Sequence, residues 1–132
     1  MKILVCGGAG FIGSAFIRNY LNNHQNDIIL NLDSLTIGSN LKNLKGIEQN
    51  QNYQFFKDDI KNQDTVNKLV NDVDTIINFA AESHVDRSIA NPKPFIETNI
   101  LGTFSLLEAA KKFEKLFIHV STDEVYGDAE DS

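Results

Sequence analysis

The feature that most constrains this chain is a cluster of glycines directly after its first apolar run. Residues 3–6 read Ile-Leu-Val-Cys, which has the length and β-branched content of a buried strand. Glycines follow at positions 7, 8, 10 and 13, and residues 11–20 carry apolar side chains at helical spacing. A strand, a tight glycine turn and a helix together predict a pyrophosphate site, because backbone amides and a helix N-terminus then face the phosphates.

Two dinucleotide-binding patterns overlap in this turn. Gly8-x-Gly10-x-x-Gly13 fits the usual dinucleotide fingerprint, and Gly7-x-x-Gly10-x-x-Gly13 fits the variant found in short-chain dehydrogenases. Their place between a strand and a helix favours cofactor binding over a loop that merely contains glycines. The residues that we expect to contact the cofactor here are Gly7, Gly10, Phe11, Ile12 and Gly13.

The composition narrows the class of protein. The chain has 132 residues, of which 42% are hydrophobic and 23% charged, and this suits one globular domain. Its net charge of −6 argues against nucleic acid or an anionic membrane as the main partner. The first apolar run is too short for a secretory signal, and no stretch reaches the ~20 apolar residues of a membrane span. We therefore expect a soluble, cytoplasmic protein in which the single cysteine, Cys6, is a small buried hydrophobe.

Strand and helix patterns alternate along the chain. Strands are expected at residues 3–6, 28–32, 53–57, 75–79 and 116–120. A first helix should end near residues 22–23, with further helices at 64–71 and 94–112 and a short one near 40–44. The alternation predicts an α/β fold, a doubly wound, Rossmann-like parallel sheet with strand order 3-2-1-4-5. We expect residues 1–132 to form one dinucleotide-binding domain.

The second predicted strand ends at Asp33, twenty positions after Gly13. An acidic residue at about this distance accepts hydrogen bonds from the adenosine ribose and repels a 2′-phosphate, which favours NAD over NADP. The alternative is that an aspartate after a strand simply starts a turn. Together with the glycines, the position of Asp33 favours the ribose contact.

Further cofactor contacts are expected at the ends of the other strands. After the third strand, Asp59 could bond the exocyclic amine of adenine while Ile60 packs on the ring. Small residues after the fourth strand would let the cofactor pass close to the backbone. The remaining residues that we expect near the cofactor are Ser34, Leu35, Thr36, Phe79, Ala80, Ala81 and Thr98.

Three segments, residues 7–14, 80–88 and 121–127, together resemble the extended short-chain dehydrogenase/reductase superfamily. Within it they closely resemble the dTDP-glucose 4,6-dehydratases, and the similarity runs over essentially the whole chain. The resemblance implies NAD as cofactor and a nucleotide-sugar as substrate. It implies that NAD⁺ takes hydride from C4 of the sugar, a glutamate removes the C5 proton, an aspartic acid protonates the departing C6 hydroxyl, and NADH returns hydride to C6.

Matching the motifs residue by residue assigns these roles. Asp123 would be the acid, Glu124 the base and Thr122 a partner of the C4 oxygen, while Ser83 would touch the substrate near the nicotinamide. Two adjacent carboxylates suit the task, because a shared apolar site splits their pKa values. The alternative is structural: Ser121-x-x-Glu124 is a capping box that would close a helix N-terminus.

Two histidines and the lack of a metal motif complete the site predictions. His119 lies within the fifth predicted strand, where a hydrogen-bonded core histidine is expected rather than a ligand. His84 lies in a loop beside the predicted site, and the sequence does not name its partner. No His, Cys or Asp cluster has metal-ligand spacing, so we predict no metal.

The resembling family activates the C4 hydroxyl with a tyrosine and a lysine four residues later on a helix. That pair should follow the Asp-Glu motif and does not occur by Ser132. Tyr53-x-x-x-Lys57 has the spacing but lies on a predicted strand, where such residues are ~13 Å apart. The resemblance therefore implies that residues 1–132 are an incomplete NAD-binding domain, which stops before the later strands and the substrate domain. We expect a fragment of a longer enzyme or a truncated gene product that carries the cofactor-binding part.

Two other functions stay open, and an oligomer is expected. The chain could be a dinucleotide-binding module without turnover, or an epimerase or reductase of the same superfamily, although Asp123 and Glu124 weaken the latter. Self-association, as a dimer or larger, is expected because the apolar helix 94–112 and an unprotected fifth strand would otherwise be uncovered.

Overall fold

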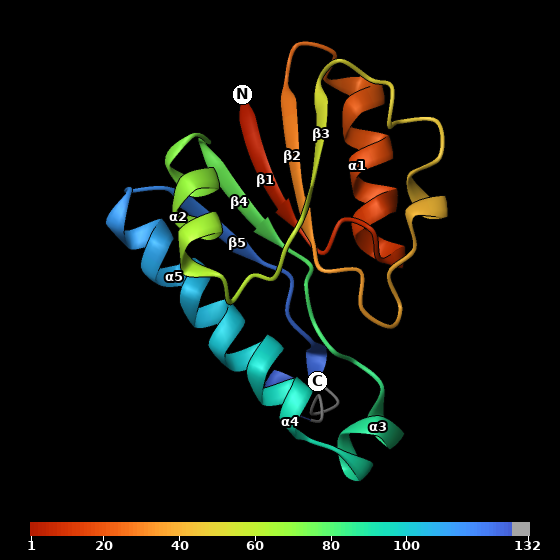
Figure 1. Cartoon of the computed structure of the whole chain (residues 1–132), viewed down its shortest axis with the longest axis vertical. Coiled ribbons are helices and arrows are strands. Elements are labelled where there is room, and N and C mark those ends of the chain that lie inside the picture. Colours follow the sequence, from red (N-terminus) through yellow and green to blue (C-terminus); the bar gives the residue numbers. More distant parts are fainter. Residues whose placement is uncertain (128–132) are drawn as a thin grey trace, which may run out of the picture.

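The computed structural model describes residues 1–127, with only the backbone described at Glu124. Five parallel strands form one sheet in the order β3-β2-β1-β4-β5, with helices on both faces (Figure 1). The strands are β1 (Lys2–Cys6), β2 (Ile28–Asp33), β3 (Tyr53–Lys57), β4 (Thr75–Asn78) and β5 (Leu116–His119). The predicted α/β class and strand order are confirmed.

Helical segments connect successive parallel strands, as in other doubly wound sheets. They are α1 (Phe11–Asn23), the 3₁₀ turn η1 (Leu41–Leu44), α2 (Gln63–Asn71), α3 (Val85–Ala90), α4 (Lys93–Phe95), the π-helix η2 (Ile96–Gly102), α5 (Thr103–Lys112) and the 3₁₀ turn η3 (Asp123–Val125). The end of α1, the short helix before β3 and the helix after it agree with the sequence predictions to within one residue.

Each face of the sheet buries its own apolar core, which explains why β1 is apolar without interruption. Ile3 and Val5 point toward α1 and pack with Ile17 and Leu21. The alternate β1 residues, Leu4 and Cys6, join the second core with side chains of α2 and α5. In Figure 1, α1 lies on one side of the strands and α2 and α5 lie on the other. Cys6 is a buried hydrophobe, as predicted, and burial raises the pKa of its thiol.

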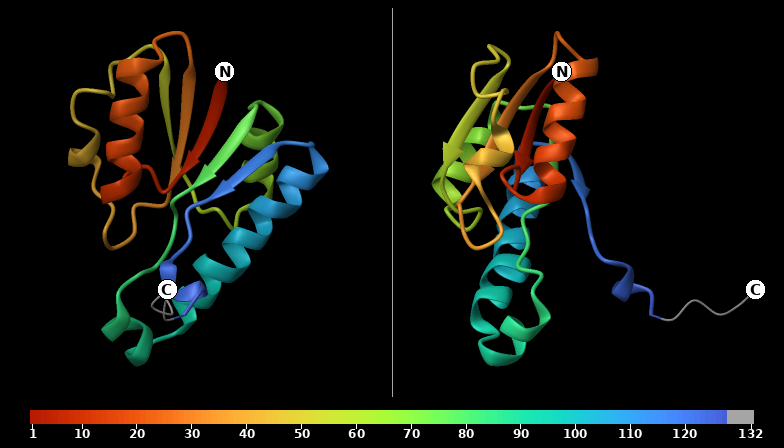
Figure 2. Two further views of the ribbon diagram at one scale, coloured as in Figure 1. Left: turned by 180° about the vertical axis from the view of Figure 1, so that it is seen from behind. Right: turned by 90° about the vertical axis from the view of Figure 1, so that its right-hand side faces the viewer.

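The helix predicted over residues 94–112 is continuous in space but not uniform in hydrogen bonding. Figure 2 shows α4, η2 and α5 as one rod that extends below the sheet. Its middle part, Ile96–Gly102, is a π-helix, and π segments occur often at functional sites. The preceding short helix α3 was not predicted, because residues 85–90 lack a buried apolar stripe.

The fifth strand is an edge of the sheet in the described part of the chain. Leu116 and Ile118 of β5 are exposed, whereas the strands β1 and β4 are buried. The segment with η3 leaves β5 and projects away from the helices (Figure 2, right). Within residues 1–127, no helix combines the length and the apolar character that a membrane crossing needs.

Two adjacent leucines on α5 provide a test of this packing. Leu106 is 0% exposed and Leu107 is 46% exposed. We expect Leu106→Ala to lower the free energy of unfolding by about 2–5 kcal/mol, because it leaves a cavity in the core. Leu107→Ala, the matched control, should cost less than about 1 kcal/mol. Urea denaturation followed by circular dichroism measures both, and equal losses would contradict the assigned orientation of α5.

Candidate functional site

A cleft of about 880 Å³ opens at the carboxyl ends of the strands. Its walls come from the glycine turn, the loops after β2, β3, β4 and β5, and the π-helix. This is the crevice between β1 and β4 where the strand order reverses, and open α/β sheets bind ligands there. The cleft therefore lies where the sequence analysis expected it.

Most of the predicted cofactor and substrate residues line this cleft. They are Gly7, Gly10, Phe11, Ile12, Gly13, Asp33, Ser34, Thr36, Asp59, Ile60, Phe79, Ala80, Ala81, Ser83, Thr98 and Thr122. Leu35 is not among the lining residues. Its backbone is in the left-handed region (φ 57°) and its side chain packs against the core under α1.

The glycine turn has its conformation because the chain passes extremely close to the backbone that directly follows β4. Gly7 has φ 78°, and a Cβ on it would lie 2.5 Å from the backbone nitrogen of Ala80. A Cβ on Gly13 would collide with the carbonyl oxygen of Gly7, so a glycine there lets α1 begin directly against the turn. The turn geometry therefore requires glycine at positions 7 and 13, whereas a Cβ on Gly10 would only make a tight contact, 3.3 Å from the Gly7 carbonyl oxygen. Gly8 is required for a different reason, since its Cβ would strike the buried side chain of Asn31.

The N-terminus of α1 opens toward the cleft. Gly10 is its N-cap and makes no side-chain cap bond, and the first turn has no acidic residue. The amides of residues 11–13 have no partner within the helix, as at any helix start. Phe11 is 87% exposed, so this end of the helix is accessible. Such an end, with its partial positive charge, suits a pyrophosphate.

Asp33 performs the structural role that the sequence analysis gave as the alternative, and a second one as well. The carboxylate is buried, and Oδ1 accepts a hydrogen bond from the Leu35 amide at 2.8 Å, which starts the turn after β2. Its Oδ2 accepts from the Ala9 amide at 2.8 Å and so ties β2 to the glycine turn. A carboxylate offers about four acceptor positions, which leaves capacity for ribose hydroxyls. The ribose contact stays a prediction.

The sequence analysis missed a clamp between the loop after β4 and the π-helix. The Glu82 amide donates to Asn99 Oδ1 at 2.8 Å, and Asn99 Nδ2 donates back to the Glu82 carbonyl at 2.9 Å. The buried Glu82 carboxylate also receives a hydrogen bond from Arg87 at 3.2 Å. Asn99 interrupts the apolar stripe of the predicted helix, and this interruption was the one feature of the sequence that could have indicated a polar contact there.

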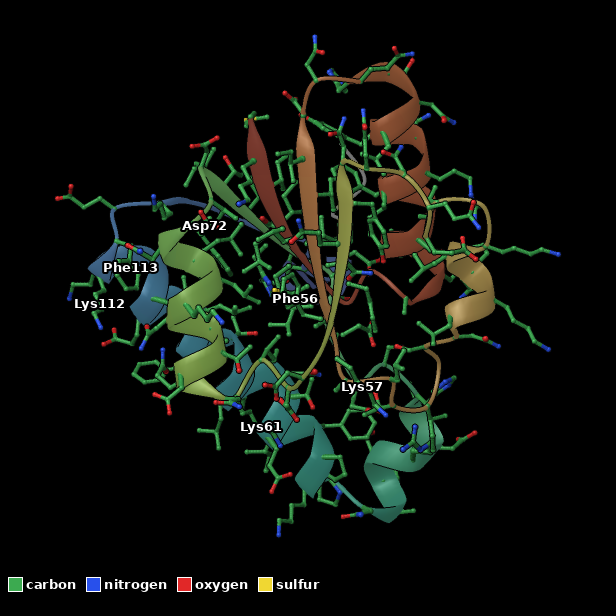
Figure 3. The ribbon with its side chains drawn as sticks, turned by 45° about the horizontal axis from the view of Figure 1, so that its top comes forward. Phe56, Lys57, Lys61, Asp72, Lys112 and Phe113 are labelled. Atoms are coloured by element: carbon green, nitrogen blue, oxygen red, sulfur yellow. The ribbon has the colours of Figure 1, made fainter. Side chains whose placement is uncertain are left out.

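The π-helix is also tied to the loop after β3. Lys61 Nζ lies 3.5 Å from Asp59 and 3.4 Å from Glu97, and Figure 3 shows Lys61 beside the helical segment that carries Glu97. The side of the cleft formed by Asp59 and Ile60 is thereby held against the side formed by Thr98. Gly102 lies directly against the Ile60 side chain in the same contact.

One buried hydroxyl in this wall lacks a partner. Thr103 Oγ1 is buried and makes no hydrogen bond within the described residues, and Thr103 lines the cleft. An unsatisfied buried hydroxyl costs free energy unless another group bonds it. A polar ligand in the cleft could supply that bond, so this wall fits a cofactor with hydroxyl or amide groups.

The prediction for His119 was partly wrong. Its ring nitrogen Nδ1 lies 3.3 Å from Asn78 Nδ2, so it has a hydrogen-bonding partner. The residue is exposed rather than in the core, because β5 is an edge strand and His119 stands at its end beside the cleft. Asn78 is fully buried and its Oδ1 accepts from the Ala80 amide at 3.0 Å. His84 also lines the cleft and precedes α3.

The predicted acid–base pair lies at the margin of the described chain. Thr122 lines the cleft and its hydroxyl donates to Asp123 Oδ1 at 3.2 Å. Asp123 is exposed and is not among the lining residues, and the side chain of Glu124 lies outside the described part of the structure. The 3₁₀ turn starts at Asp123, one residue later than a cap at Ser121 requires. Among the described residues, no group of three or more His, Cys, Asp or Glu could hold a metal ion.

Sequence comparison decides the family. A profile described as GDP-mannose 4,6 dehydratase matches residues 4–132. The chain belongs to this family. Two relatives are a low-salt glycan biosynthesis protein of Haloferax volcanii, 48% identical over 132 residues, and a dTDP-glucose 4,6-dehydratase of Escherichia coli, 49% identical over 140 residues. They cover 99% and 97% of this chain, but the chain covers only 42% and 38% of them.

Solved structures of family members superpose closely on the described fold. A dTDP-glucose 4,6-dehydratase of Streptomyces venezuelae with NAD bound has a TM-score of 0.92 and 43% identity, over 100% of this chain and 42% of that one. One from Bacillus anthracis in complex with NAD has a TM-score of 0.88 and 42% identity, over 100% and 41%. The motif-based resemblance to the dehydratases is confirmed. This chain spans about two fifths of these proteins.

Two glycines that line the same cleft give a matched test of the turn. Gly7 and Gly38 both have positive φ, but a Cβ on Gly38 meets nothing within 4 Å. We expect Gly38→Ala to cost about 1–2 kcal/mol of unfolding free energy, from the left-handed conformation alone. Gly7→Ala adds a collision with the β4 backbone and should cost more than about 3 kcal/mol. Similar losses in chemical denaturation would contradict the close approach.

Proposed function

We propose that this protein is an NAD-dependent nucleotide-sugar 4,6-dehydratase, with these residues supplying its cofactor-binding part. The proposed reaction converts dTDP-glucose to dTDP-4-keto-6-deoxyglucose. The observation that carries the proposal is the glycine turn, which packs against the backbone of Ala80 at the point where the strand order reverses. The relatives of this chain include dTDP-glucose 4,6-dehydratases. The NAD bound in related structures supports the choice of cofactor.

The cleft offers a place for each part of NAD. The amides at the start of α1 would receive the pyrophosphate, and Asp33 the adenosine ribose. Asp59 and Ile60 would flank the adenine. The ion pairs of Lys61 with Asp59 and Glu97 would hold this loop in place for that contact. The nicotinamide end would lie near the residues after β4, Phe79 to Ala81, and near Thr98. The unpartnered hydroxyl of Thr103 supports a polar ligand in the same wall.

The substrate roles follow from the chemistry of the side chains at the other end of the cleft. Bound NAD would supply the hydride acceptor for C4 and the hydride donor for C6. Glu124 would remove the C5 proton, which is acidic beside a C4 ketone, and Asp123 would protonate the C6 oxygen so that it leaves as water. The hydrogen bond from Thr122 to Asp123 supports an arrangement in which one residue orients the other. Ser83, on the loop clamped through Glu82, would contact the sugar.

A binding module without turnover is the second candidate for these 132 residues as an isolated chain. The observation that favours it is coverage, since the chain spans about two fifths of the dehydratases that it matches. An epimerase is supported less, although a UDP-glucose 4-epimerase of Thermotoga maritima shares the fold at 30% identity and a TM-score of 0.84 over 100% of this chain. The Asp123-Glu124 pair favours dehydration over epimerisation. Self-association stays a prediction for either candidate.

Cofactor choice is tested by calorimetry with NAD and NADP. We expect the chain to bind NAD at least about tenfold more tightly than NADP, because the Asp33 carboxylate would repel a 2′-phosphate. Asp33→Asn removes the charge, so it should narrow this difference. The variant also replaces one of the two acceptor oxygens with an NH₂ group, so the ratio of the NAD and NADP affinities, rather than either affinity alone, is the readout. Equal affinities for the two cofactors in the unmodified chain would contradict the ribose contact of Asp33.

Turnover is tested by supplying the protein with NAD and dTDP-glucose and detecting the 4-keto-6-deoxy product by mass spectrometry. Where product forms, Asp123→Asn and Glu124→Gln should each lower kcat about 100-fold or more while the dissociation constant of NAD stays unchanged. Asp64→Asn, on α2 and not among the residues that line the cleft, is the control. Product formation by residues 1–132 alone would reject the module candidate, and unchanged kcat in both variants would reject the assigned acid and base.

A further inference from the structure

Asn31 occupies a position where asparagine is unusual. It lies in the middle of β2, paired in register with Val5 on one side and Phe55 on the other, and is 0% exposed. Asparagine is depleted in strands, and burying its amide is costly unless both ends are bonded. A core asparagine between Leu30 and Leu32 therefore requires a specific use for its side chain.

Both ends of the Asn31 amide are bonded, one of them to the glycine turn. Oδ1 accepts from the Gly8 amide at 3.1 Å, and Nδ2 donates to the Tyr53 hydroxyl oxygen at 2.8 Å. The orientation of the amide follows from the donors, because a backbone N–H can only donate and must face Oδ1. The lack of space for a Cβ at Gly8 comes from the same close contact.

This hydrogen bond is one of three that hold the turn to β2. The amides of Gly7, Gly8 and Ala9 donate in succession to the Leu32 carbonyl at 2.9 Å, to Asn31 Oδ1, and to Asp33 Oδ2 at 2.8 Å. Three consecutive peptide groups are thus fixed before α1 begins. Their orientation determines where the following amides, those proposed to meet the pyrophosphate, point into the cleft.

Tyr53 supports this arrangement from outside the site. It is the first residue of β3, is 7% exposed, and belongs to the core under α1 rather than to the lining of the cleft. Its ring packs in the apolar core, and its hydroxyl oxygen accepts the hydrogen bond from Asn31. Without that oxygen, Asn31 Nδ2 would be a buried donor that has lost its acceptor, and only the bond to Gly8 would hold the amide.

We propose that Asn31 and Tyr53 are positioning residues of the cofactor site: the Tyr53 hydroxyl anchors the Nδ2 end of the Asn31 amide, and the Oδ1 end of that amide holds the glycine turn in its pyrophosphate-binding geometry. This inference rests on the proposed NAD function. It assigns an effect on cofactor affinity to two residues that do not touch the cleft. Asp33 acts on the adjacent amide, so the two supports are separate bonds to consecutive peptides.

The test compares two Tyr→Phe variants that each remove one buried or half-buried hydroxyl bond. Tyr53→Phe removes the bond to Asn31, and Tyr20→Phe removes a 2.7 Å bond to Asp27 within the same core region but away from the turn. We call the two bonds from the Tyr53 hydroxyl through the Asn31 amide to the Gly8 amide the relay. Amide hydrogen exchange of Gly8, measured by NMR relative to the core amide of Leu30, reports directly whether the relay holds Gly8. Calorimetry with NAD reports affinity.

We expect Tyr53→Phe to speed Gly8 exchange about tenfold relative to Leu30 and to weaken NAD binding about 3–10-fold. Asn31→Ala should have larger effects on both, and Tyr20→Phe should change neither, whatever it does to thermal stability. Unchanged Gly8 exchange in Tyr53→Phe would overturn the relay, and unchanged NAD affinity would overturn its role in the site. If the unmodified chain bound no NAD, the proposed function would fail, while the Gly8 comparison would still decide the relay by itself.

Discussion

The structure depends on the close approach of the glycine turn to the strands on either side of β1. Gly7 lies against the backbone at Ala80 after β4, and three successive amides of the turn donate to β2. No side chain larger than hydrogen fits at that contact without moving the backbone. Because the same turn starts α1, the contact also fixes the helix whose N-terminus opens into the cleft. One backbone constraint thereby sets both the sheet connection and the proposed phosphate site.

The sheet around this turn is buried on both faces, and this is what makes the position rigid. Alternate residues of β1 enter two separate cores, one under α1 and one under α2 and α5. A shift of β1 by one residue would exchange the two sets and leave both cores mismatched. The strand that carries the turn therefore has a single register, and the cleft at its end has a fixed floor.

The walls of the cleft depend on polar bonds rather than on apolar packing. Asn99 of the π-helix holds the loop that carries Glu82 and Ser83, and Lys61 bridges that helix to the loop of Asp59. Asn78 holds the ends of β4 and β5 together through Ala80 and His119. Asn99 and Asn78 bond backbone groups, whereas Lys61 pairs with two carboxylates. All three place loops and have no part in the proposed chemistry.

The sequence by itself determined the local elements and the order of the sheet. Apolar runs, the glycine spacing and the acidic residue at Asp33 each depend on near neighbours in the chain, and they predicted five strands, the turn and the position of the cleft. Tertiary structure decided the rest, because it depends on residues far apart in the sequence. The Asn31–Tyr53 bond spans 22 residues and the Asn99–Glu82 clamp spans 17. The interrupted apolar stripe marked Asn99 as unusual, but no local pattern joined either asparagine to its partner. His119 was wrongly placed in the core although the predicted strand order already made the fifth strand an edge, and its exposure follows from that edge position.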